Sequence, residues 1–171
     1  MHQGVGLETF NTTSEKRAVH ALFECCNSVG LARSLAHGRP YADHDALFRR
    51  ADAMLFSLPD AAIDEILEAY PQIGARPGSV KSAAEQCSVW NDDTSVMAEL
   101  DAGALRYRDR FGFMFVMYVG GASCAEVAAA LSDRMHNDSE TELKVVRNEL
   151  AKINRTRLER MLGPEGGYQN W

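Results

Sequence analysis

Apolar residues recur every three or four positions along most of this chain, and short groups of Gly, Pro, Asp, Asn and Ser divide the pattern into segments. This spacing places apolar side chains on one face of an α-helix, whereas a half-buried strand needs strict alternation. The clearest segment is residues 139–162, which carries one apolar stripe and is followed by Gly163-Pro164. The sequence therefore predicts an all-α fold, a single-domain bundle of about eight helices.

Capping residues and helix breakers indicate where the helices begin and end. Thr12-Thr-Ser-Glu15 has the form of a capping box, Gly112 interrupts a long helix, and Ser123 or the turn before it caps the next helix. Residues 113–119 taken alone fit either a helix or a strand. The expected helices cover residues 12–26, 29–36, 43–58, 60–70, 81–90, 100–112, 123–131 and 139–162.

The length of 171 residues suits one domain with one hydrophobic core. We expect a loose lead-in over residues 1–10, the all-α domain over residues 11–162 and a tail over residues 163–171. No apolar run approaches the roughly 20 residues of a membrane helix. The N-terminus has no signal-peptide pattern, so we expect a cytoplasmic protein that does not enter a membrane.

Charge and cysteine usage exclude further classes of protein. Lys and Arg number 18 against 24 Asp and Glu, and the resulting net charge of −6 disfavours nucleic-acid binding while leaving room for a local cationic pocket. The cysteines show no CxxC spacing, so we expect reduced core thiols instead of a metal site or a disulfide framework. They are Cys25, Cys26, Cys87 and Cys124.

Polar groups of catalytic type gather in residues 68–86, between two apolar-periodic segments. Pro71 disfavours the helical conformation at Tyr70, so Tyr70 is expected at a helix end. Glu85 and Gln86 follow on the first turns of the next helix, where a carboxylate gains from the helix dipole. A phenol, a carboxylate, a carboxamide and the Ser82 hydroxyl are therefore expected to converge there.

A series of motifs over residues 10–162 matches one family in order and spacing. The chain resembles the 2-oxo-4-hydroxy-4-carboxy-5-ureidoimidazoline (OHCU) decarboxylases, which form (S)-allantoin after urate oxidation. The matching motifs are Phe23-Glu-Cys-Cys26-Asn-Ser28, Arg39-Pro40-Tyr41, Ala51-Asp52, Pro71-Gln-Ile-Gly74, Ser82-Ala-Ala-Glu85-Gln86, Tyr107 to Phe113 around Arg110, Arg134 with Asn137, and Lys152-Ile153 ahead of Arg157-Leu158.

The resemblance implies an all-α bundle and a carboxy-lyase acting on OHCU, or on a related anionic heterocycle that contains nitrogen. Electron density left by loss of CO₂ is held by the adjacent imine or carbonyl, so the reaction needs neither a metal nor an organic cofactor. Members of the family are commonly dimeric, so a homodimer is one expectation. The residues themselves favour neither oligomeric state.

Two departures from the family pattern bear on the reaction. Members carry a histidine, regarded as the proton-transfer group, immediately before Pro-x-Ile-Gly, and this chain has Tyr70 there. The usual Gly-Arg-Ser is replaced by Gly121-Ala122-Ser123. The alternatives are therefore a diverged member with a changed reaction in specialised metabolism, or a catalytically silent protein that binds a ureide or a partner.

The resemblance assigns catalysis to Tyr70 and Glu85, and substrate binding to a further set of residues. Tyr70 also fits a role in ring packing, and Glu85 a solvated helix start. A guanidinium matches a carboxylate bidentately, so Arg157, on an otherwise apolar stripe, suits the substrate's carboxylate, and a structural ion pair is its alternative. The substrate-binding set is Pro71, Ser82, Gln86 and Arg157.

The remaining charged residues are expected to be structural. Arg110 fits a structural partner of an acidic helix, and the charges along residues 138–160 are mostly a solvated helix face. Four of the five histidines fall on helix surfaces and turns, and none occupies the position that Tyr70 fills. They are His20, His37, His44 and His136.

Overall fold

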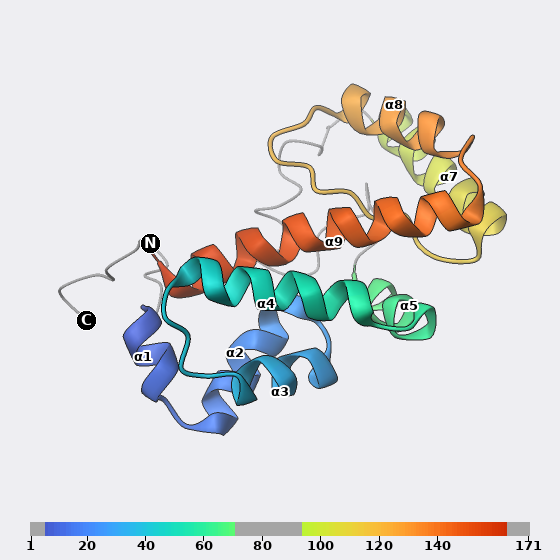
Figure 1. Ribbon diagram of the computed structural model, residues 1–171. Helices are drawn as coiled ribbons and strands as arrows, with labels where there is room; N and C mark the ends of the chain where they lie inside the picture. Colours follow the sequence, from blue (N-terminus) through green and yellow to red (C-terminus); the bar gives the residue numbers. More distant parts are fainter. Residues whose placement is uncertain (1–5, 71–93, 164–171) are drawn as a thin grey trace. The chain divides into compact units, whose positions relative to one another are not determined.

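The computed structural model describes residues 6–70 and 94–163, and all regular secondary structure in these ranges is helical (Figure 1). The all-α prediction is confirmed. No helix in the described ranges is long and apolar enough to cross a membrane. The helices are α1 (Leu7–Thr12), α2 (Glu15–Cys26), α3 (Val29–His37), α4 (His44–Ser57), α5 (Asp60–Glu68), α7 (Thr94–Phe111), α8 (Cys124–Arg134) and α9 (Ser139–Leu162).

The chain divides into two compact units, which are described separately. The first unit consists of residues 1–59 and 151–171, and the second of residues 60–150. Helix α9 contributes its residues up to Leu150 to the second unit and those from Ala151 onward to the first. The prediction of one domain over residues 11–162 stays a prediction.

Helix α1 lies in the predicted lead-in, and the prediction of a loose segment is wrong for residues 7–10. Phe10 is 1% exposed, and its ring stacks on Tyr41 with the centroids 6.4 Å apart. Asn11 exchanges two hydrogen bonds of 2.9 Å with the backbone of Tyr41. Helix α1 is too short to show periodicity in the sequence, and these tertiary contacts stabilise it.

Capping side chains begin most of the helices in the first unit. Helix α2 begins after Ser14, whose hydroxyl accepts a hydrogen bond from the Arg17 N–H at 3.4 Å. The predicted capping box starting at Thr12 is therefore wrong, because Thr12 ends α1 and the chain turns before Ser14. Asp43 caps α4 by accepting from the Ala46 N–H at 2.7 Å.

The second unit contains α5, α7, α8 and the first half of α9. Helix α7 ends at Phe111, and Gly112 follows with a φ of 81°, which only glycine adopts without strain. Residues 113–119 then form neither a helix nor a strand. Ser123 caps α8 as expected, and it also forms a capping box with Glu126. The break at Gly112 and the start of α8 confirm the prediction.

Candidate functional site

Tyr70 lies directly after α5, where the sequence predicts a helix end. Its backbone N–H donates to the Leu67 carbonyl oxygen at 3.0 Å, and its side chain is half-buried. The residues beyond it that the sequence assigns to the same site lie outside the described ranges, so the convergence of these groups stays a prediction. They are Pro71, Ser82, Glu85 and Gln86.

Arg157 is buried in the second half of α9, within the first unit. Its side chain is 6% exposed, and Nη1 donates to the Cys25 carbonyl oxygen at 3.3 Å. Burial raises the pKa of the neighbouring Cys26 thiol, and the positive charge of Arg157 opposes that rise. The predicted position of Arg157 on an apolar stripe is confirmed, since Ile153 and Leu158 are also buried.

The cysteines are only partly as predicted. Cys25 and Cys26 are reduced thiols buried in the core of the first unit. Cys124 is also reduced, but it is half-buried on α8, and Cys87 lies outside the described residues. Within the described ranges no three His, Cys, Asp or Glu side chains are grouped as a metal site requires.

A buried polar cluster in the second unit has no counterpart in the sequence prediction. Glu142 on α9 is 0% exposed, although the charges of this helix are predicted to be mostly solvated. Nε and Nη2 of Arg134 both lie 2.6 Å from Glu142 Oε1. The Tyr107 hydroxyl donates to the same oxygen, and Asn137 Nδ2 donates to Oε2 at 2.9 Å. Both oxygens of the Glu142 carboxylate therefore accept hydrogen bonds, and its charge is balanced by the Arg134 guanidinium.

This cluster holds the segment after α7 in place. Arg134 Nη1 donates to the Val116 carbonyl oxygen at 2.7 Å, and its guanidinium carbon lies 4.4 Å from the centre of the Phe115 ring. Glu149 accepts a hydrogen bond from the Tyr118 N–H at 3.1 Å. Since residues 113–119 make no regular secondary structure, these bonds satisfy backbone groups that a helix or sheet would otherwise pair.

The Tyr107 hydroxyl predicts a dependence of stability on alkaline pH. Burial, together with the hydrogen bond to Glu142, raises the pKa of Tyr107 above its ordinary value of about 10. The folded state therefore keeps a proton that the unfolded chain releases, and this stabilisation is fully present below about pH 10 and is lost as the pH rises further. In Tyr107→Phe the free energy of unfolding should fall less steeply above about pH 10 than in wild type, measured by urea unfolding across a pH series. Equal slopes would contradict this role.

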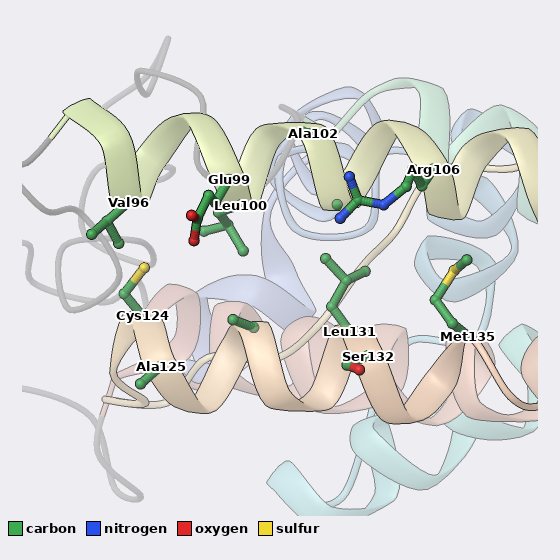
Figure 2. A pocket seen from close by; sticks show the side chains of 12 residues that line it. Val96, Glu99, Leu100, Ala102, Arg106, Cys124, Ala125, Leu131, Ser132 and Met135 are labelled. Carbon is green, nitrogen blue, oxygen red and sulfur yellow. The ribbon is translucent and has the colours of Figure 1, made fainter.

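A groove of about 830 Å³ lies between α7 and α8 in the second unit (Figure 2). Its floor includes Leu100 and Leu131, both buried, and its rim carries Glu99 and Arg106. The helices come close at Gly103, where an added Cβ would lie 2.7 Å from a Leu131 methyl group. Of the predicted site residues that the structure describes, neither Tyr70 nor Arg157 lines this groove.

Comparison with known proteins decides the family. The family model described as OHCU decarboxylase matches residues 11–159. The chain belongs to the OHCU decarboxylase family. The matched range includes every residue that the sequence assigns to catalysis or substrate binding, together with the buried cluster.

Relatives and solved structures agree with membership of the OHCU decarboxylase family. The chain is 30% identical over 172 residues to an OHCU decarboxylase of Haloferax volcanii, a match covering 96% of this chain and 100% of that protein. It is 26% identical over 145 residues to the uric acid degradation bifunctional protein TTL of Arabidopsis thaliana, which covers 80% of this chain and 45% of that protein. The chain thus spans less than half of that bifunctional relative. A crystal structure of OHCU decarboxylase in the presence of (S)-allantoin shares the fold, with a TM-score of 0.73 at 23% identity over 88% of this chain and 99% of that one.

Proposed function

We propose that this protein is a cofactor-independent carboxy-lyase that converts OHCU to (S)-allantoin in the breakdown of urate. The observation that carries the proposal is the family match over residues 11–159. The OHCU decarboxylase of Haloferax volcanii, matched along its whole length, supports the same substrate. A small anionic heterocycle suits the buried cation of Arg157.

The proposed reaction breaks the bond between the substrate carbon and its carboxylate. CO₂ leaves, the electron pair is delocalised into the adjacent unsaturated bond, and a proton is delivered to one face of that carbon. Arg157 binds the carboxylate, Glu85 orients the hydroxyl and ureido groups, and Gln86 pairs with an amide edge of the heterocycle. Ser82 and Pro71 complete the contacts with the substrate.

Tyr70 is proposed as the hydrogen-bond or proton donor to the reacting carbon. A tyrosine titrates near pH 10, whereas histidine titrates near pH 6.5, so a phenol is a poor base and a modest acid at neutral pH. We therefore expect slow decarboxylation. This replacement of histidine also favours the second candidate function, a diverged member that acts on another carboxylated heterocycle or that binds a ureide without catalysis.

The test generates OHCU from urate with urate oxidase and hydroxyisourate hydrolase, and follows the circular dichroism of the allantoin that forms. Wild type should produce (S)-allantoin above the spontaneous racemic background. Arg157→Gln should lower kcat/KM by roughly 10- to 100-fold, because it removes a charge-assisted contact. The matched control is Arg155→Gln, an arginine on the same helix that is half exposed and pairs with Glu159.

Two results would contradict the proposal. If wild type gives only racemic allantoin, the protein does not decarboxylate OHCU, and the second candidate function gains. If Arg157→Gln and Arg155→Gln are equally active while both stay folded, Arg157 does not bind the substrate's carboxylate. Far-ultraviolet circular dichroism of each variant checks that it is folded.

A further inference from the structure

The carboxamide of Asn154, on the second half of α9, is buried, and no described residue pairs with its oxygen. Asn154 is 4% exposed, and within the described part of the chain its Oδ1 accepts no hydrogen bond. Burying an acceptor without a donor destabilises a fold, so nearly all such groups in native structures have a partner. An acceptor left in this state therefore indicates a donor from outside the described part of the chain, and a bound ligand is one such source.

Asn154 lies one helical turn before Arg157, so both side chains project from the same face of α9. Among the described residues, four polar or charged side chains are buried. Asn154 and Arg157 belong to the first unit, whereas Arg134 and Glu142 pair with each other in the second. Ile153 and Leu158, which directly precede Asn154 and follow Arg157, are buried apolar residues. Arg157 and Asn154 break the apolar stripe with a cationic donor and, beside it, a neutral acceptor.

The two groups complement one kind of small molecule. A guanidinium donates to a carboxylate or carbonyl oxygen, and the Asn154 oxygen needs an N–H. A ureide carries carbonyl oxygens and N–H groups a few bonds apart, and so satisfies both. Packing alone would favour an apolar residue here, since asparagine is a weak helix former and its amide loses water on burial.

We infer that Asn154 contacts the substrate directly, its Oδ1 accepting a hydrogen bond from an N–H of the bound ureide beside Arg157. The inference rests on the proposed function for the class of ligand. It makes Asn154 a specificity-determining residue that favours ligands with an N–H next to the group that Arg157 binds. An analogue lacking that N–H would not form this hydrogen bond, so it should bind more weakly than the ureide.

Asn154→Leu tests the inference, since leucine fills a similar volume without polar atoms. The affinity for (S)-allantoin, measured by isothermal titration calorimetry, should fall about tenfold, as expected for one lost hydrogen bond. The Tm of the free protein should rise, because an unpaired buried acceptor has been removed. If the Asn154 oxygen had a hydrogen-bond donor within the fold, Asn154→Leu would instead lower the Tm.

The matched control is Asn148→Leu on the same helix. Asn148 is exposed, and its Nδ2 donates to the Lys144 carbonyl oxygen at 3.0 Å. This variant should bind (S)-allantoin as wild type does. Asn154→Ala provides a second variant without steric demand, and it should also weaken binding about tenfold.

The inference is overturned if either Asn154 variant binds (S)-allantoin as tightly as wild type, or if wild type does not bind it. It is also overturned if Asn154→Leu lowers the Tm, because the amide then has its partner inside the fold. Decarboxylation by wild type is measured separately. Binding of (S)-allantoin that depends on Asn154, without formation of optically active allantoin, would overturn the proposed function and leave this inference standing.

Discussion

Tyr70→His is expected to raise the rate of OHCU decarboxylation by about 10²- to 10⁴-fold, the usual contribution of a general acid or base with a matched pKa. Tyr70 directly follows α5 and is half-buried, in the position where the family has its histidine. An imidazole titrates near neutral pH and exchanges a proton with the reacting carbon far more readily than a phenol. The rate of (S)-allantoin formation from freshly generated OHCU measures the effect.

The control for Tyr70→His is Phe56→His, which places a histidine at an exposed aromatic position on α4. It should leave the rate unchanged. If wild type already turns over as fast as Tyr70→His, histidine is dispensable and Tyr70 is an adequate proton donor. If Tyr70→His stays at background, Tyr70 does not occupy the catalytic position, and a changed substrate becomes the better explanation.

The helices could be predicted from the sequence because their signals are local. Ser123 and Gly112 act within their own turns, and the stripe of α9 repeats over residues 139–162. Helix α1 could not be predicted, since what stabilises it is the contact of Phe10 and Asn11 with Tyr41, about thirty residues further along the chain. The sequence predicts the cap of α2 at the wrong residue because Thr12 and Ser14 are both good caps, and only tertiary contacts decide between them.

The polar residues of the interior were harder to predict than the apolar ones. Arg157 stands out because it interrupts an apolar stripe, and its burial confirms that reading. Glu142 and Asn154 interrupt the same helix, and the spacing of Glu142 from Val146 and Leu150 is a signal of burial that the sequence carries. On a helix so rich in charge, this spacing becomes decisive only once Arg134 is known to pair with Glu142.

Glu142→Gln should lower the free energy of unfolding by about 3–5 kcal/mol, because it leaves the buried guanidinium of Arg134 without a counter-charge. Urea unfolding followed by circular dichroism measures the change. The matched control is Glu140→Gln, two residues earlier on α9, where an exposed carboxylate pairs with Lys144 at 3.3 Å. That variant should unfold at nearly the wild-type urea concentration, since exposed pairs contribute little. Equal unfolding of the two variants would show that the buried pair adds nothing to stability.

A double variant separates the cost of an unpaired charge from the value of the ion pair. Arg134→Met combined with Glu142→Leu removes both charges and keeps similar volumes, so it should recover much of the stability that Glu142→Gln loses. Recovery is expected to be incomplete, because the Arg134 guanidinium also donates to the Val116 carbonyl oxygen and Glu142 accepts from the Tyr107 hydroxyl. Those backbone and phenol groups lose a partner when the pair is replaced. If the double variant is less stable than Glu142→Gln, the cluster stabilises the fold mainly by holding residues 113–119, and its charge pairing is secondary.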